Sequence, residues 1–335
     1  MKLEDLDKID SSGMYRFYDD WPKIARESYD SVDNKLIIEK TNHIAFCGMG
    51  GSGAIGDFIA SILSKKNIHV SVIKGYTLPK IVDKNTLVVA ISVSGNTEET
   101  LVALKQALAL NCKIVAFSSG GKIEEFCDEK KITFHKLKLI HSPRVSFVNF
   151  LFPILKILEE ILPIEKSEVN NGLSELKKTK KNICSQNLTD TNQSLSLASF
   201  IHGIPLIYYP YGFEAAAIRF KNSLQENAKI HVISEDLIEA CHNGIVVWEK
   251  RSSVRPILIR GTDDHIKTKE RWELLKKFFD ERDIEFKEIV SKNGDIFTKL
   301  INLIYTLDFA SLYKAIQLGI DPTPVKSIDY MKKLL

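Results

Sequence analysis

Two short stretches rich in glycine, serine and threonine each follow an apolar segment of strand length. The first is CGMGGSG at residues 47–53, and the second is SVSGNT at residues 92–97. Glycines let a backbone approach an anion closely, while hydroxyls and the N–H groups of a helix N-terminus donate hydrogen bonds to it. Such a combination favours a terminal phosphate monoester. The residues that we expect to hold it are Gly51, Ser52, Ser92, Ser94 and Thr97.

The glycines of the first stretch also match G-x-G-x-x-G, a pattern of dinucleotide-binding turns. A dinucleotide site needs an acidic residue about 20 residues later to bind the ribose hydroxyls. The chain has no Asp or Glu between Asp57 and Asp83. Lys74, at the end of the next predicted strand, suits a 2′-phosphate, so an NADP-dependent oxidoreductase stays as a less favoured alternative.

Three further residues have side chains suited to proton transfer or to stabilising negative charge. Glu226 lies in QENAK at the end of a predicted helix, and His242 lies in HNGIVVW before a predicted strand. A carboxylate and an imidazole are groups that can act together as general base and general acid in a proton transfer. Arg144, in SPRVSF, adds a permanent cation that can stabilise a developing oxyanion.

Composition narrows the class of protein. The 46 basic and 43 acidic residues of the 335-residue chain leave a net charge of only +3, which does not favour a nucleic-acid partner. We expect no membrane span, because no apolar run approaches about 18 residues. Five scattered cysteines without a C-x-x-C pair favour a reducing, cytoplasmic setting. The eight histidines show no metal-ligand spacing, so we expect neither a metal nor another cofactor.

Apolar runs of strand length alternate with segments of helical period twice along the chain. This alternation predicts an α/β fold with parallel sheets covered by helices on both faces. The expected strands lie at residues 43–48, 69–75, 86–92, 113–119, 133–138, 204–210, 244–249, 255–261 and 285–290. The expected helices lie at residues 52–63, 97–110, 122–129, 214–225, 267–283 and 297–318, with a final one after Pro324, and residues 145–184 are expected to be largely helical.

Two details of the chain concern helix starts and domain limits. Asn96, followed three residues later by Glu99, predicts a helix start with a capping pair. Four segments are expected: an N-terminal helical segment, a first α/β subdomain with the phosphate-binding loops, a helical connector, and a second α/β subdomain with a C-terminal helix. Their limits are residues 1–40, 41–165, 166–190 and 191–335.

The sequence S-x-S-G-x-T after a strand, preceded by a G-G-S-G turn, resembles the sugar isomerase (SIS) fold. With QENAK, HNGIVVW and the terminal PVKSIDYMKKLL, the chain resembles the archaeal-type bifunctional phosphoglucose/phosphomannose isomerases, a branch of the phosphoglucose isomerase superfamily. The resemblance covers nearly the whole chain. It implies two SIS-type, flavodoxin-like subdomains in one chain, and a homodimer whose sites lie at the subunit interface.

The resemblance also implies an activity and residue roles. The activity is interconversion of glucose 6-phosphate and mannose 6-phosphate with fructose 6-phosphate through an enediolate, without a metal. Glu226 is then the base, His242 opens the ring, Arg144 faces the enediolate, and Lys332 reaches into the site. The residues of the two glycine-containing stretches hold the phosphate.

The chain departs from the family pattern at two positions. Gln225 stands where the family usually has asparagine, and Gly244 stands where it usually has glutamate. Neither change removes a proton-transfer group. A phosphosugar-binding regulator without catalysis stays as an alternative, although residues 1–40 are too short and too acidic for the DNA-binding module that such proteins carry.

Overall fold

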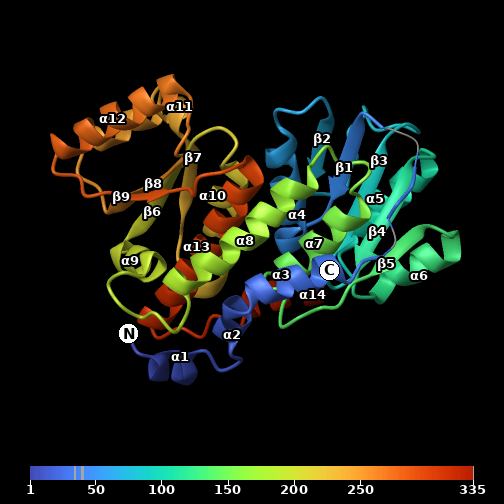
Figure 1. The fold of residues 1–335 in the computed structure, drawn as a ribbon, viewed down its shortest axis with the longest axis horizontal. Helices are drawn as coiled ribbons and strands as arrows, with labels where there is room; N and C mark the ends of the chain where they lie inside the picture. The colour runs from blue at the N-terminus through green and yellow to red at the C-terminus, as the bar shows by residue number, and fades with distance from the viewer. Residues whose placement is uncertain (34, 39–40, 335) are drawn as a thin grey trace. The chain divides into compact units, whose positions relative to one another are not determined.

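The computed structural model describes residues 1–33, 35–38 and 41–334, which form two compact units (Figure 1). One unit comprises residues 20–173, and the other comprises residues 1–19 together with 174–335. We refer to them as the central unit and the terminal unit. Each unit contains one parallel β-sheet. The subdomain limits expected from the sequence stay a prediction.

The sheet of the central unit has five strands in the order β2-β1-β3-β4-β5, all parallel. All five strands were expected from the sequence. The chain order reverses between β1 and β3, which makes their carboxyl ends the topological switch point where ligands bind in such sheets. The strands are β1 (His43–Cys47), β2 (His69–Ile73), β3 (Leu87–Ser92), β4 (Lys113–Ser118) and β5 (Thr133–Lys136).

Helices cover both faces of this sheet because alternate side chains of each strand point to opposite sides. On one face, Phe46 packs so closely on α4 that a Cβ on Gly56 would lie 2.9 Å from it. On the other face, Ala45 and Cys47 pack with Ala103 of α5. Five helices belong wholly or mainly to the unit: α3 (Trp21–Asp30), α4 (Gly50–Leu63), α5 (Glu98–Ala109), α6 (Gly121–Lys130) and α7 (Phe147–Ile157).

The terminal unit has a four-stranded parallel sheet in the order β7-β6-β8-β9. Its strand order matches the first four strands of the central unit's sheet, with the switch point between β6 and β8. The two sheets therefore share the same topology over these four strands. The strands are β6 (Ile204–Tyr209), β7 (Ile233–Asp236), β8 (Val254–Arg260) and β9 (Lys287–Val290).

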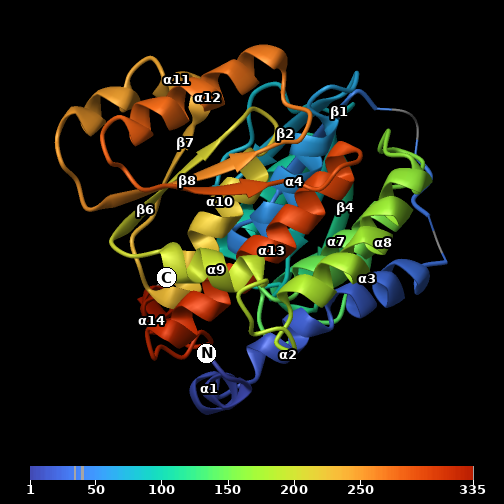
Figure 2. The same ribbon diagram turned by 60° about the vertical axis from the view of Figure 1, so that its left-hand side comes forward.

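Helices also cover both faces of the second sheet (Figure 2). The helix α12 packs on one face through Trp272 and Phe279, which join the apolar cluster around Tyr208 and Leu258. On the other face α10 contacts β6 and β7, and it is backed by α13. The helices are α1 (Leu3–Ile9), α2 (Met14–Asp19), α9 (Gln193–Phe200), α10 (Glu214–Ser223), α11 (Leu237–Ala240), α12 (Ile266–Asp280), α13 (Ile296–Gln317) and α14 (Lys326–Leu334), and α8 (Lys166–Ile183) crosses the limit between the units.

The sequence expectation for residues 244–249 is wrong. The strand expected at 244–249 is a 3₁₀-helix, η2 (Gly244–Glu249), whose Trp248 donates a hydrogen bond to the Tyr208 hydroxyl at 2.9 Å. In this apolar run only Trp248 is buried, so the side chains do not alternate between buried and exposed as they would in a strand. The strand beside β6 is instead ISED, an edge strand that the apolar pattern missed because edge strands need little apolar surface.

The largely helical stretch expected over 145–184 consists of two helices. The first, α7, ends at Ile157, and the second, α8, begins at Lys166. Pro163 lies between them, where its ring cannot continue a helix that precedes it. The remaining strands and helices form within a few residues of their expected limits.

At the amino ends of β1 and β2, His43 lies in a chain of side-chain hydrogen bonds. Its Nδ1 is 3.1 Å from the Thr86 hydroxyl, and its Nε2 is 2.9 Å from the Ser71 hydroxyl. Burial lowers the pKa of His43 below its usual value; His69 lowers it further, whereas Asp83 raises it. The neutral imidazole is thus the form that suits the folded state.

This lowered pKa predicts a pH dependence of stability. The unfolded chain binds a proton to His43 more readily than the folded one, so His43 stabilises the fold above about pH 6.5 and loses that contribution as the pH falls. We expect His43→Gln to reduce the loss of the urea midpoint between about pH 7.5 and about pH 5.5. The exposed His231, changed to Gln, is the control. An identical loss in His43→Gln and the parent would contradict the assignment.

Candidate active site

The two glycine-containing loops come together at the switch point of the central unit. The backbone N–H of Val93 donates a hydrogen bond to the Ser52 hydroxyl at 3.0 Å, which joins the start of α4 to the loop after β3. Within that loop, the Ser92 hydroxyl accepts from Gly95 N at 3.1 Å and lies 2.9 Å from the Thr97 hydroxyl. Hydroxyls from both loops therefore form one cluster at the N-termini of α4 and α5.

Ser94 belongs to the same loop and is partly exposed. Its hydroxyl accepts a hydrogen bond from Asn96 N at 3.3 Å, which leaves the hydroxyl proton able to donate. Ser52 is in the same position, since the bond from Val93 uses only a lone pair. The cluster thus offers O–H donors as well as backbone N–H groups to an anion.

Close backbone contacts hold both loops in place. Gly95 has φ +72°, and a Cβ there would lie 1.6 Å from the carbonyl oxygen of Gly120. A Cβ on Gly51 would lie 2.9 Å from the carbonyl oxygen of Pro143, next to the backbone of Arg144. The side chain of Arg144 is only 6% exposed. The structure therefore brings all the expected phosphate-binding residues and the segment of Arg144 together.

The expected capping pair at the start of α5 is wrong. The N-cap residue is Thr97, and its side chain makes no capping hydrogen bond. Asn96 bonds elsewhere: its Oδ1 accepts from Lys122 N at 3.1 Å, in the first turn of α6. The first turn of α5 is therefore not capped by the hydroxyl of Thr97.

The residue on which the dinucleotide alternative depends has a different partner. Lys74 Nζ pairs with Asp57 Oδ2 at 2.5 Å. Burial raises the pKa of Asp57, and the ammonium of Lys74 opposes that shift. A 2′-phosphate would need the ammonium group of Lys74, which is already paired with Asp57. This ion pair therefore disfavours an NADP site at the end of β2.

In the terminal unit, Glu226 lies in a π-helical turn, η1 (Leu224–Ala228), that directly continues α10. π-helical turns are rare and frequently occur at functional sites. The Glu226 side chain is partly buried, and Lys229 Nζ donates a hydrogen bond to the backbone carbonyl of Glu226. The sequence predicted the end of a helix here and did not indicate the wider turn.

His242 is exposed and follows α11 at the carboxyl end of β7. Two residues later, a Cβ on Gly244 would lie 2.5 Å and 2.6 Å from the carboxylate oxygens of Glu235. The absence of a side chain at 244 thus leaves room for the Glu235 carboxylate. Burial raises the pKa of Glu235, and the carboxylates of Glu239 and Asp236 raise it further.

Glu226 and His242 lie at opposite edges of the terminal unit's sheet. α10 runs back from the end of β6, so η1 precedes the start of β7, whereas His242 follows the end of that strand. The four residues of β7 alone span about 13 Å at the usual rise per residue. Within this unit the expected base and ring-opening residue are therefore apart.

Lys332 lies on α14, whose described residues are all partly or fully exposed. Its neighbours Lys326 and Lys333 are exposed too. The structure gives none of the three lysines a distinguishing contact among the residues it describes. The assignment of Lys332 therefore stays a prediction.

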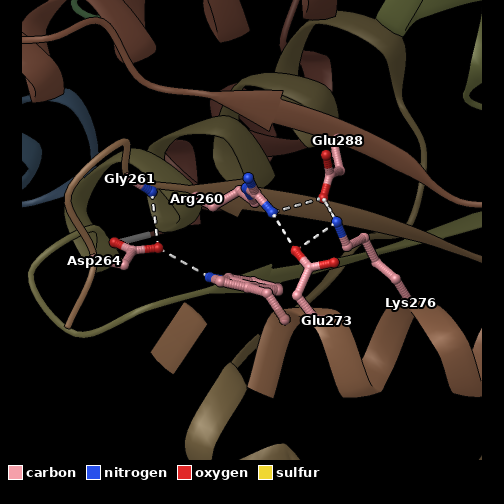
Figure 3. A network of polar contacts seen from close by, with 7 residues as sticks. Arg260, Gly261, Asp264, Glu273, Lys276 and Glu288 are labelled. Atoms are coloured by element: carbon pink, nitrogen blue, oxygen red, sulfur yellow. Dashed lines mark hydrogen bonds and ion pairs between the residues drawn. The ribbon is translucent and has the colours of Figure 1, made fainter. Parts of the chain in front are cut away.

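A polar network closes the end of β8 in the terminal unit (Figure 3). Asp264 Oδ2 accepts hydrogen bonds from Gly261 N at 3.0 Å and from Trp272 Nε1 at 2.9 Å. Beside it, Arg260 pairs with Glu273 at 3.3 Å and with Glu288 at 3.1 Å. In this sheet a carboxylate of the protein occupies the loop that corresponds to the hydroxyl cluster of the central unit.

Sequence reasoning missed one buried polar group near Glu226. Asp308 lies in the apolar helix α13 and is 0% exposed, paired with Arg219 of α10 at 2.7 Å. The signal was available, because a single Asp in the run YTLDFASLY requires a buried partner. Arg219 in AAAIRF is the matching cation on an otherwise apolar helix face.

Two absences concern other kinds of site. Among residues 1–33, 35–38 and 41–334, no group of three or more His, Cys, Asp or Glu side chains is arranged to hold a metal ion. In the same described part of the chain, no helix has both the length and the apolar character needed to cross a membrane.

Comparison with known proteins identifies the family. Residues 37–150 match the SIS domain, and residues 190–335 match the bacterial phospho-glucose isomerase C-terminal SIS domain. The bifunctional phosphoglucose/phosphomannose isomerase of Aquifex aeolicus is 31% identical over 87% of this chain and 90% of its own length. The chain belongs to the bifunctional phosphoglucose/phosphomannose isomerase family. It therefore carries two SIS domains of an isomerase family, as the sequence predicted.

Two other similar proteins show the range of this isomerase family's relatives. A D-glucosamine-6-phosphate 4-epimerase of Sulfolobus acidocaldarius is 30% identical over 73% of this chain and 77% of its own length. A crystal structure of a hypothetical protein from Thermus thermophilus superposes with a TM-score of 0.76 at 12% identity, over 99% of this chain and 92% of that one. The latter likeness concerns the fold alone.

The contact at Gly95 generates a prediction for the hydroxyl cluster. Gly95→Ala should destabilise the protein and weaken the binding of inorganic phosphate, because a Cβ cannot fit against Gly120 and positive φ costs roughly 1–3 kcal/mol. Urea unfolding and isothermal calorimetry measure the two effects. Gly75→Ala is the control, since a Cβ there meets nothing within 4 Å. Parent-like phosphate affinity in Gly95→Ala would show that this loop does not hold the anion.

Proposed function

We propose that the protein is a metal-independent aldose–ketose isomerase that interconverts glucose 6-phosphate and mannose 6-phosphate with fructose 6-phosphate. The observation that carries the proposal is the cluster of Ser52, Ser92 and Thr97 hydroxyls at the switch point, in a chain of this isomerase family. A cluster of neutral donors at two helix N-termini fits the phosphate of a hexose phosphate. Gly51 and Ser94 complete the proposed phosphate-binding set.

The proposed chemistry is a proton transfer between neighbouring carbons. His242 assists opening of the sugar ring, and the Glu226 carboxylate removes the C2 proton of the open aldose to give an enediolate. The Glu226 carboxyl group then gives a proton to C1, after part of the abstracted proton has exchanged with solvent, while the proton of O2 moves to O1, so the ketose forms with no net change in atoms. Arg144 stabilises the charge of the enediolate, and Lys332 contributes a second cation.

Dual specificity follows from the intermediate. Glucose 6-phosphate and mannose 6-phosphate differ only in configuration at C2, which becomes planar in the enediolate. A base that reaches C2 in both aldoses therefore serves both reactions. The requirement is space for rotation about the C2–C3 bond, not a second catalytic group.

We further propose that the protein acts as a homodimer with its sites at the subunit interface, in the cytoplasm. The separation of Glu226 and His242 across the terminal unit's sheet supports this arrangement, because a second copy can supply the missing partner. An apolar surface also supports it, since exposed apolar patches mark association sites. On α14 the exposed apolar side chains are Ile328, Tyr330, Met331 and Leu334.

Two other functions are distinguishable in one assay. A phosphosugar-binding regulator would bind hexose phosphates without turnover. A 4-epimerase acting on glucosamine 6-phosphate, which the likeness to the Sulfolobus enzyme raises, would leave glucose 6-phosphate unchanged. Incubation with each phosphosugar, followed by chromatographic separation of the products, separates these functions from the proposed isomerase.

Replacing the proposed base tests the mechanism. Glu226→Gln should lower turnover of both aldoses by on the order of 10²–10⁴-fold, because general bases contribute that much to such reactions. The decisive measurement is deuterium incorporation at C2 of the aldose made from fructose 6-phosphate in heavy water. Glu249→Gln, an exposed glutamate of the same unit, is the control. Exchange at the parent rate in Glu226→Gln would exclude Glu226 as the base.

Mixing two inactive variants tests the shared site. Glu226→Gln and His242→Ala chains, refolded together in equal amounts, should recover about a quarter of the parent activity on glucose 6-phosphate, because half of the dimers are mixed and each holds one intact site. Size-exclusion chromatography measures the dimer. Activity that stays at the level of the separate variants would contradict a site shared between two copies.

A further inference from the structure

We propose that Asp308 and Ser311 of α13 are positioning residues that orient Glu226 by holding the π-helical turn η1 on both sides of it. The inference rests on the function proposed above, in which Glu226 is the base. It assigns a role to a buried polar group that the proposed chemistry does not itself use. All of its residues lie in the terminal unit.

The first contact lies immediately before η1. The Asp308 carboxylate accepts hydrogen bonds from Arg219 Nε at 3.0 Å and Nη2 at 2.7 Å, and from the Ser223 hydroxyl at 2.7 Å. Arg219 and Ser223 are four residues apart, so they lie on one face of α10. The Arg219 and Asp308 side chains are 4% and 0% exposed, so this buried contact fixes the last turn of α10 to α13 immediately before η1.

The second contact lies immediately after Glu226. Asn227 Nδ2 donates a hydrogen bond to the Ser311 hydroxyl at 2.9 Å, and that hydroxyl donates to the backbone carbonyl of Asp308 at 2.7 Å. Asn227 and Ser311 are both fully buried. Glu226 is thus the partly buried residue between two buried attachments to a single turn of α13.

Because of the geometry of a π-turn, these two attachments determine the direction in which the Glu226 side chain points. A π-turn bonds residues five apart instead of four, so it holds one residue more than an α-helical turn. If η1 relaxed to an α-helix, the following residues would shift by one position, which is about 100° around the helix axis. The Asn227–Ser311 bond opposes that rotation, and a proton-transferring carboxylate must stay within about 2.6–3.2 Å of its target.

Stability alone is a weak explanation for the Arg219–Asp308 pair. Burying two charges carries a desolvation penalty that the attraction between them often does not exceed, and apolar replacements are frequently as stable. Orientation is a use that an apolar pair could not serve, because only the carboxylate of Asp308 can bind Arg219 and Ser223 in fixed directions. The network thus couples the register of α10 to that of α13.

The test compares two buried serines that each bond to the backbone of α13. Ser311→Ala removes the acceptor of Asn227, whereas Ser194→Ala removes a 2.7 Å bond from α9 to the Thr306 carbonyl and leaves η1 untouched. We expect Ser311→Ala to lower kcat by on the order of 10- to 100-fold with an unchanged KM, as for a misplaced catalytic group. Ser194→Ala should keep the parent kcat.

A double-mutant cycle gives a second readout. Asn227→Ala should lower kcat as much as Ser311→Ala. The double variant should have the same kcat as either single variant, because both changes break the same hydrogen bond between Asn227 and Ser311. Parent-like kcat in both single variants would overturn the proposal. Equal losses in Ser311→Ala and Ser194→Ala, following the loss of unfolding free energy, would also overturn it in favour of a general structural role.

The outcome is separable from failure of the proposed function. If Glu226→Gln keeps the parent exchange rate, Glu226 is not the base and the proposed function fails whatever the serine variants do. If Glu226→Gln is inactive but Ser311→Ala and Asn227→Ala turn over normally, the mechanism stands and only the positioning role fails. Urea unfolding of each variant confirms that kcat is compared between folded proteins.

Discussion

Parallel pairing of β1 with β3 is the constraint on which the rest of the central unit depends. In this pairing Cys47 lies opposite Ala90, so the two strands end side by side and their following loops leave the same edge. That arrangement alone lets Ser52, from the start of α4, accept a hydrogen bond from Val93. A cluster of hydroxyls from residues 40 positions apart in the chain is therefore a property of sheet topology before it is a property of either loop.

The two sheets share one strand order, but the loops at their switch points carry different polar groups. At the switch point of the central unit, the hydroxyls of Ser52, Ser92 and Thr97 and nearby backbone N–H groups lie at the N-termini of α4 and α5. In the terminal unit, the Asp264 carboxylate already accepts from the corresponding backbone, and burial raises its pKa. A carboxyl group of the protein in one sheet and neutral hydroxyl donors in the other support our proposal that phosphate binds to the central unit.

Sequence alone predicted most of the fold, because parallel strands are continuous apolar runs and the helices between them have a clear period. The prediction failed at residues 244–249 and 233–236, where the apolar pattern of the sequence did not match the secondary structure. GIVVWE forms a 3₁₀-helix in which Trp248 is buried, and ISED pairs with β6 although only its isoleucine is apolar. The positions of Ser52, Ser92 and Thr97 were predictable because loop chemistry and strand ends coincide in the sequence. The π-turn at Glu226 was not, since its buried contact, the hydrogen bond from Asn227 to Ser311, comes from a residue more than 80 positions away in the chain.

The π-turn also makes the direction of the Glu226 side chain sensitive to the deletion of a neighbouring residue. Because η1 holds one residue more than an α-helical turn, deletion of one residue of Leu224–Ala228 other than Glu226 leaves a sequence that can continue α10 as a regular helix. The apolar contacts of α10 with the sheet lie upstream and need not change. If Glu226 is the base that we propose, such a deletion would redirect its carboxylate while the side chain itself stays in the chain.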